Sequence, residues 1–321
     1  MKRVGVTFAF VVAAGLIITG CGDSDDTSAD APASGAGDRS AAQGDGKSTT
    51  AAKAGDDGMP RLRCPAKIAK DPGGPDIIGI KLGMSRDEAL NVVRCHTEDE
   101  AYINMEKRWL PNLRNHATEL GAQTFTAQAG DTSECSFRSF NDMQKCGLGN
   151  RVWDHIDESI MVASPGMPGG ETVVAVWRMQ NFKDGQMPSA ESIESALVKK
   201  YGPYQFKEEQ RNRFQRLYWA QDSQGNAYSE GHPLFRTCLG GVQPQAGNVT
   251  WRQGCGANIS VQFVYSRTNP ALLETLRVGM SHQENLWNFA ESLQAELDQV
   301  EEKRRDEELD RARQNGSDVQ L

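Results

Sequence analysis

Apolar residues recur at every second position along several short stretches in the middle of the chain. In the clearest stretch they are Ile259, Val261, Phe263 and Tyr265. A period of two is typical of a strand with one buried face. Weaker stretches of the same kind predict further strands over 76–82, 122–127, 135–140, 159–163, 172–179, 216–220 and 272–278.

Helices are predicted where apolar residues recur every three or four positions behind a capping residue. Ser85 with Glu88, and Ser281 with Glu284, match the capping box, in which the serine and the glutamate each bond to the backbone of the first helical turn. Gly202 followed by proline is typical of a helix end. We therefore expect helices over 85–95, 189–200 and 281–300.

The apolar stripe of the last predicted helix ends near residue 300. The run from Glu301 to Glu308 carries charges of both signs at i,i+4 spacing. Such pairs support a solvated helix by only a few tenths of a kcal/mol each. We interpret the tail as a solvated helical extension, with a coiled-coil contact to a partner as the alternative.

These elements predict an α+β fold, an antiparallel sheet packed against helices mostly on one face, followed by a long C-terminal helix. The expected organisation is a signal peptide over 1–20, a lipidated cysteine and tether over 21–58, a globular region over 59–280 and the helix with its charged tail over 281–321. Within the globular region a division into two sub-modules is expected near residue 165.

The N-terminus has the pattern of a lipoprotein signal. Lys2 and Arg3 precede an uncharged apolar stretch over 4–18, which is followed by Thr19, Gly20 and Cys21. A basic start, a short apolar run and small residues at the cut predict export. Ile18-Thr19-Gly20-Cys21 resembles a lipobox, which predicts that Cys21 carries lipid and tethers the chain to a membrane. The alternative is an ordinary signal peptide with a cysteine near the cut by chance.

The residue after the cysteine is Gly22, and not the aspartate that retains many such lipoproteins in the inner membrane. We therefore expect the outer membrane, on its periplasmic side. Residues 22–57 are small and polar, with no aromatic residue, which predicts a disordered tether. A tether of about 36 residues has an average reach on the order of 30–35 Å.

The chain has a formal net charge of −8, and loss of Lys2 and Arg3 with the signal peptide makes the mature charge −10. An acidic chain without a basic block is a poor ligand for nucleic acid and for anionic lipid. We therefore expect no nucleic-acid partner, and a membrane association that depends on the acyl chains.

Six cysteines remain beyond Cys21, at intervals of 31, 11 and 17 residues within consecutive pairs. An even number in an oxidising compartment predicts disulfides, although six cysteines allow about 15 pairings. Zinc is the alternative, but no C-x-x-C and no histidine pair with ligand spacing occurs. The predicted bridges are Cys64–Cys95, Cys135–Cys146 and Cys238–Cys255.

The sequence contains no recognisable constellation of catalytic residues. The five histidines are scattered, and no H-E-x-x-H, G-x-S-x-G or P-loop pattern occurs. Asp154 and Asp157 flank His155 and suggest acid–base chemistry, but polar residues before a strand are more often a solvated edge. We predict no catalytic residue, no metal site and no cofactor.

Two features suggest protein binding. The loop Ser164 to Gly170 contains Pro165, Met167 and Pro168; its prolines limit backbone freedom, and Met167 offers an adaptable apolar tip. A solvent-exposed turn is the alternative. The six tryptophans are expected to be mostly core, and any two lying together on the surface would mark a binding patch.

Residues Ile78 to Ala89, I-G-I-K-L-G-M-S-R-D-E-A, resemble the strand-to-helix turn of SmpA/OmlA-type envelope lipoproteins and of the wider β-lactamase-inhibitor-protein-like group. The resemblance implies a helix pair packed on one face of an antiparallel sheet, in modules that bind other proteins. Gly279-Met280-Ser281 echoes Gly83-Met84-Ser85, which suggests either a diverged duplication or a coincidence at a common type of junction.

A second pattern lies between residues 176 and 238 and resembles uncharacterised exported proteins of Gram-negative bacteria, which imply no activity. The matching residues are Val176 to Arg178, Pro188, Leu197 to Pro203, Trp219, Asp222, Gly225 and Cys238. The function expected from the sequence is protein binding in the cell envelope, as a scaffold or as an inhibitory or immunity lipoprotein. An envelope hydrolase acting on cell-wall material is the alternative.

Overall fold

The computed structural model describes residues 62–107, 113–135, 146, 151–210, 214–245 and 247–316. All of them lie within one unit, Ala52–Leu321. The predicted signal peptide, Cys21 and the tether lie outside the described residues, as do most of the strand expected over 135–140.

The described strands are β1 (Asp76–Ile77), β2 (Ile80–Lys81), β3 (Tyr102–Glu106), β4 (Thr124–Glu134), β5 (Arg151–Ala163), β6 (Ala175–Asn181), β7 (Phe206–Gln210), β8 (Phe214–Asp222), β9 (Cys255–Tyr265) and β10 (Leu273–His282). The described helices are α1 (Arg86–His96), α3 (Ala190–Tyr201), α4 (Phe235–Leu239) and α5 (Gln283–Gly316).

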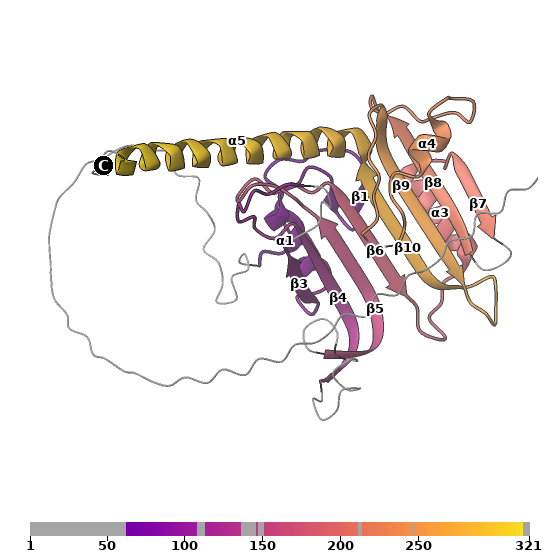
Figure 1. Ribbon diagram of the computed structural model, residues 1–321. Coiled ribbons are helices and arrows are strands. Elements are labelled where there is room, and N and C mark those ends of the chain that lie inside the picture. Colours follow the sequence, from indigo (N-terminus) through magenta and orange to yellow (C-terminus); the bar gives the residue numbers. More distant parts are fainter. Residues whose placement is uncertain are drawn as a thin grey trace, which may run out of the picture. The chain divides into compact units, whose positions relative to one another are not determined.

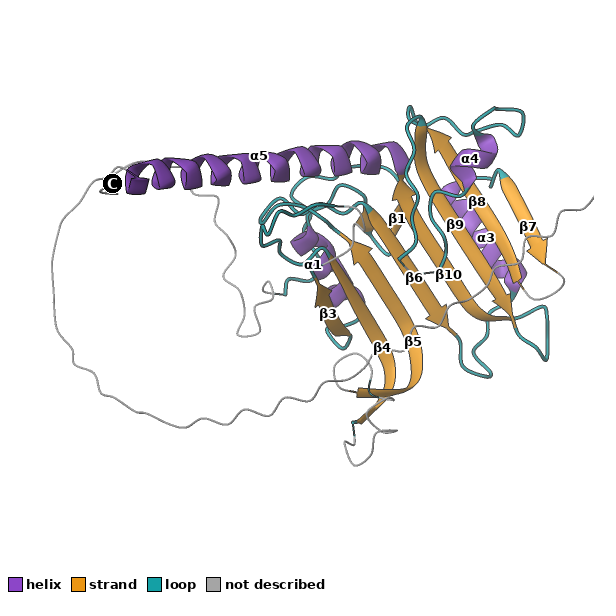
Figure 2. Ribbon diagram, in the orientation of Figure 1, coloured by secondary structure: helices purple, strands orange, loops and turns teal. Residues whose placement is uncertain are grey.

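Eight strands form one antiparallel sheet in the order β3-β4-β5-β6-β10-β9-β8-β7 (Figures 1 and 2). Strands β1 and β2 form a separate two-stranded hairpin. The α+β fold with a long C-terminal helix is therefore confirmed.

The order of the sheet contains a repeat. One helix and four strands, α1 with β3 to β6, are followed by a second set, α3 with β7 to β10, and the two sets meet where β6 pairs with β10. Arg178 and Val278 lie opposite each other at this junction. From the centre of the sheet to either edge, the strands therefore follow as the fourth, third, second and first strand of their set.

Backbone bonds at the start of each helix confirm that the two sets are equivalent. Ser85 forms a bridge with Thr172 just before β6, and Ser189 forms the matching bridge with Leu272 just before β10. The first helical N–H of each set donates to the residue before that bridge, Arg86 N to Glu171 O and Ala190 N to Ala271 O.

The internal division therefore lies in the connection between β6 and α3. The boundary expected near residue 165 falls instead inside the first set, in the β5–β6 connection. The echo of Gly83-Met84-Ser85 at residues 279–281 does not mark the repeat, because it lies inside β10 and Ser189 is the true counterpart of Ser85.

Helices α1 and α3 pack on the same face of the sheet. Leu90 of α1 is fully buried and Leu197 of α3 nearly so, against strand residues such as Phe125, Val261 and Val278. These strand residues belong to the alternating apolar set, so burial of one face accounts for the pattern seen in β9. Removing this surface from water is the main stabilising contribution to the fold.

The predicted capping box of α1 is confirmed: the Ser85 side chain accepts from Glu88 N, and Glu88 bonds back to the Ser85 backbone. The box predicted at Ser281 is wrong. Ser281 is a fully buried residue of β10 and pairs with Ala175 and Asn258, so the sheet continues through the position where the cap was expected.

His282 provides the cap of α5 instead. Its Nδ1 accepts from the backbone N–H of Asn285 at 3.2 Å, and burial lowers the pKa of this imidazole, which keeps the accepting nitrogen unprotonated. Helix α5 then runs for 34 residues and leads away from β10 (Figure 2). Among the described residues, no helix is both long and apolar enough to cross a membrane.

Candidate functional site

The structure pairs the six cysteines as predicted. Their Cα–Cα distances are 5.6 Å for Cys64–Cys95, 5.7 Å for Cys135–Cys146 and 5.4 Å for Cys238–Cys255. The first bridge ties the start of the described chain to α1, and the last ties α4 to β9. The last bridge belongs to the cluster in which α4 packs on the sheet.

The predicted binding loop is held by a buried amide and a buried ion pair. Gln123 exchanges two hydrogen bonds with the backbone of Gly166, at 3.1 and 3.2 Å. Glu171, 7% exposed, accepts from Arg86 Nη1 at 2.8 Å and from the backbone of Gly169 at 2.9 Å. The loop is therefore a fixed part of the structure.

The apolar tip expected at Met167 is wrong. Met167 packs against Leu293 and Leu297 of α5, and Pro165 is buried. Only Pro168 and the two glycines after it are exposed. The loop thus supports α5, and binding by its exposed tip stays a prediction.

The acid–base candidate around His155 is a surface ion-pair network. His155 Nε2 lies 3.3 Å from Asp157, and Lys183 bridges Asp157 at 3.3 Å and Asp131 at 2.9 Å. A hydrogen bond from Lys183 holds the pKa of Asp131 below its ordinary value. Within the described ranges, no group of three or more His, Cys, Asp or Glu residues is arranged to hold a metal ion.

A second polar cluster, which sequence reasoning missed, lies on the helix face of the sheet. Glu158 of β5 accepts from His96 of α1 at 3.0 Å and from Arg178 of β6. Burial opposes ionisation of Glu158, but the bonds and charges of His96 and Arg178 outweigh it and leave the pKa of this carboxyl below its ordinary value. The cluster ties α1 to the centre of the sheet.

The face of the sheet opposite α1 and α3, here called the open face, is covered only in part by described residues. Helix α4 packs over Tyr218 and Ala220. The strap, residues 240–251 apart from 246, crosses the central strands, where Trp177 Nε1 donates to Gln243 O at 3.0 Å. Gly279 lies under the strap, and a Cβ there would stand 2.8 Å from Val242.

Next to the strap, one row of side chains crosses all eight strands of the open face. Each residue is the direct register partner of the next, from one edge of the sheet to the other. The row, here called the central row, consists of Tyr102, Gln128, Ser159, Met179, Arg277, Gln262, Arg216 and Glu208. It contains no lysine, and its single acidic residue lies on the edge strand β7.

The middle of the central row borders a groove of about 800 Å³, whose lining includes Phe214, Gln262, Arg267, Glu274 and Arg277. Arg277 Nη1 donates to Gln262 at 3.3 Å. Neither Arg277 nor Arg267 has an ion-pair partner among the described residues. The alternation of β10 would have placed Arg277 on the polar face, but the sequence does not reveal which residues stand beside it.

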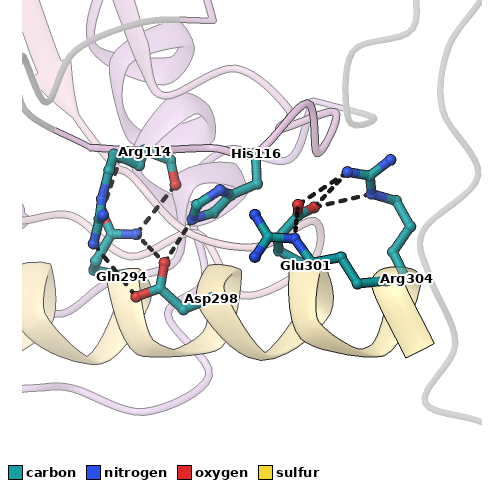
Figure 3. Close-up of polar contacts among 7 residues, drawn as sticks. Arg114, His116, Gln294, Asp298, Glu301 and Arg304 are labelled. Carbon is teal, nitrogen blue, oxygen red and sulfur yellow. Dashed lines mark hydrogen bonds and ion pairs between the residues drawn. The ribbon is translucent and has the colours of Figure 1, made fainter. Parts of the chain in front are cut away.

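Two tryptophans meet the condition set for a binding patch. Trp177 and Trp219 are buried, and Trp109 lies outside the described residues. Trp251 and Trp287 line the same groove beside α5. Helix α5 is held there by the 113–117 loop, through contacts that Figure 3 shows.

Comparison of the chain with protein-family models, curated protein sequences and solved structures finds no match. The resemblance to envelope lipoprotein modules therefore stays a prediction.

Proposed function

We propose that this chain is a lipid-anchored protein of the bacterial cell envelope that binds another protein through the central row of the open face. The lipid is carried by Cys21, in the outer membrane facing the periplasm. The bound protein is either a component that the chain scaffolds or an enzyme or toxin that it inhibits.

The observation that carries the proposal is the composition of the central row. Binding surfaces are enriched in aromatic residues, methionine and arginine, and depleted in lysine and acidic residues. The row has tyrosine, methionine and two arginines beside three neutral polar residues and one glutamate, in a chain with more acidic than basic residues. A sheet face that contacts only water is not expected to be enriched in these residue types.

The charges indicate an acidic partner. Arg277 and Arg267 line the groove together with Glu274, and neither arginine has an ion-pair partner among the described residues. An arginine can bind a carboxylate through two parallel hydrogen bonds. A partner carboxylate between the two arginines would replace water with charge-assisted bonds. Such pairs raise the association rate and fix the orientation of the complex.

Co-purification tests this proposal. The tagged full chain is isolated from envelopes of the native cell beside two variants, Arg277→Glu and Arg252→Glu. Both make the same charge change, but Arg252 is an exposed loop residue that is not part of the central row. We expect a stoichiometric partner with the unchanged chain and with Arg252→Glu, and its loss with Arg277→Glu.

Equal recovery with all three chains would show that the open face is not the binding site. The anchor is tested separately: a fatty-acid analogue should label the unchanged chain and not Cys21→Ala. Labelling of both chains would refute lipidation at Cys21, but it would not bear on the proposed binding surface.

A further inference from the structure

Strand β3 forms one edge of the eight-stranded sheet (Figure 1). Among the described residues it pairs only with β4, so the backbone N–H and C=O groups along its outer side have no strand beside them. Such an edge is a template for pairing with another chain unless charges, proline or a covering segment protect it. The two edges of this sheet differ in that protection.

The opposite edge strand, β7, is protected by charge. Three consecutive residues, Lys207, Glu208 and Glu209, are charged. If two copies of β7 paired antiparallel about its middle residue, Glu208 would face Glu208 of the second copy. Like charges directly opposite each other are destabilising, so this edge is unfavourable for pairing with itself.

The β3 edge has little charge and exposes apolar surface. Its sequence, Tyr-Ile-Asn-Met-Glu, has one charged residue, at its end. Tyr102 is 37% and Met105 38% exposed, and they are two of the five large apolar or aromatic side chains that are exposed among the described residues. Ile103 is only partly buried against the main core. A strand laid along this edge would give all three side chains a neighbour.

The register with β4 fixes the face on which each residue of β3 lies. Ile103 and Met105 are opposite core residues of β4, so both lie on the helix face of the sheet. Tyr102, Asn104 and Glu106 alternate with them and lie on the open face. A two-fold axis perpendicular to the sheet would place each face of one copy beside the same face of the second copy.

We propose that β3 of a second copy of this chain pairs antiparallel with β3 across this edge, so that two copies form a symmetric dimer with one continuous sheet. With the two-fold axis at Asn104, every position of β3 is opposite a complementary one. Ile103 faces Met105 of the second copy, which is an apolar pair on the helix face. Tyr102 faces Glu106, whose carboxylate can accept from the tyrosine hydroxyl. The two Asn104 amides, each both donor and acceptor, face each other.

The charges near the two ends of β3 favour a second copy as the occupant of this edge. Glu106 accepts a hydrogen bond from Asn104 but has no ion-pair partner among the described residues. The Arg151 guanidinium stands over the Tyr102 ring, with its central carbon 5.9 Å from the ring centroid. Within one copy, Tyr102 and Glu106 are about 13 Å apart along the strand. In the dimer they are opposite each other, so Glu106 of the second copy comes beside Arg151, and the axis repeats this contact.

A single new cysteine tests the position of the axis. Asn104 would face Asn104 of the second copy with their Cβ atoms about 4.5–5.5 Å apart, close enough for a disulfide. The full chain with Asn104→Cys should therefore form a covalent dimer under mild oxidation, both when purified and in an extract of the native cell. The unchanged chain, which contains Cys21, gives the baseline.

Two exposed residues provide matched controls for the cross-link. Lys107 follows β3 directly, three residues from the axis, so two copies of it would be about 20 Å apart. Glu208 is the middle residue of the other edge strand, β7. Neither Lys107→Cys nor Glu208→Cys should form a covalent dimer above the baseline.

A second measurement does not depend on new cysteines. Asn104→Lys would place two lysines opposite each other at the axis, and Asn104→Glu would place two glutamates there. We expect the dissociation constant of each variant alone, from sedimentation, to rise about fivefold. An equimolar mixture of the two variants should recover most of the lost affinity, because lysine would then face glutamate. Thermal unfolding of each variant verifies that it is folded.

Three results would overturn the proposal. One is the absence of a covalent Asn104→Cys dimer, including the case in which this cysteine links only to a different protein in the cell extract. The second is a dimer that Lys107→Cys or Glu208→Cys forms equally well. The third is a mixture of the folded lysine and glutamate variants that associates no more tightly than either variant alone.

Discussion

Replacement of Leu297 by alanine tests the packing that holds α5 to the rest of the protein. Leu297 is fully buried, in a cluster with Leu120, Leu293 and the half-buried Met167, so three separate segments meet at its side chain. Leucine-to-alanine changes at such sites cost about 2–5 kcal/mol, more where the surroundings cannot collapse into the space. Hydrogen bonds of Gln294 and Gln123 hold both contacting loops, so we expect a loss of about 3 kcal/mol.

The assay is chemical unfolding followed by tryptophan fluorescence, with hydrogen exchange of the 113–120 loop measured in parallel. Leu309→Ala is the matched control, the same change on the same helix at an exposed site, measured at dilution. It should cost no more than about 0.5 kcal/mol. A loss below about 1 kcal/mol for Leu297→Ala, with unchanged exchange of the loop, would refute the packing argument.

Three further results are expected. Gly279→Ala should destabilise the protein by about 1–3 kcal/mol in thermal unfolding, because the new Cβ would meet Val242 of the strap; unchanged stability would show that the strap moves freely. The pKa of Glu158 is lowered in the folded state, so its contribution to stability is present above its ordinary value of 4.5 and is lost as the pH falls through the lower folded value. Stability should therefore decrease more between pH 7 and 3 for the unchanged chain than for Glu158→Gln, and parallel curves would contradict this. Replacing Cys238 and Cys255 together with alanine should cost about 3 kcal/mol in urea unfolding, because the closed loop has 17 residues; no loss would show that the bridge does not constrain the unfolded chain.

Local patterns predicted the elements of this fold well where the pattern and the tertiary structure agree. The Ser85 capping box and the alternation in β9 are examples, because each is satisfied by neighbours in the sequence or by burial of one face. Ser281 shows the opposite case. Like Ser85, Ser281 is followed three residues later by a glutamate, as in a capping box. Pairing with β6 and β9 nevertheless continues the strand through Ser281, so that His282 caps the helix instead.

The surfaces could not be predicted in the same way. The alternation of apolar and polar residues places Arg277 and Met179 on a polar face, but it does not show that β6 and β10 are neighbours. The central row could therefore not be recognised from the sequence. The proline- and glycine-rich composition of 164–170 indicated a loop, whereas the contact of Met167 with α5 depends on a helix more than a hundred residues later. The disulfides were easier, because short intervals favour sequential bridges.

The most direct test of the proposed function is site-specific photo-cross-linking in living cells. A photoreactive residue is placed at Met179, in the middle of the central row, or at the exposed Lys199 of α3, on the other face of the sheet. The account predicts one discrete adduct with another protein from position 179, its loss when Arg277→Glu is added, and no such adduct from position 199. An adduct from position 199 alone, or one from position 179 that persists with Arg277→Glu, would contradict binding through the open face.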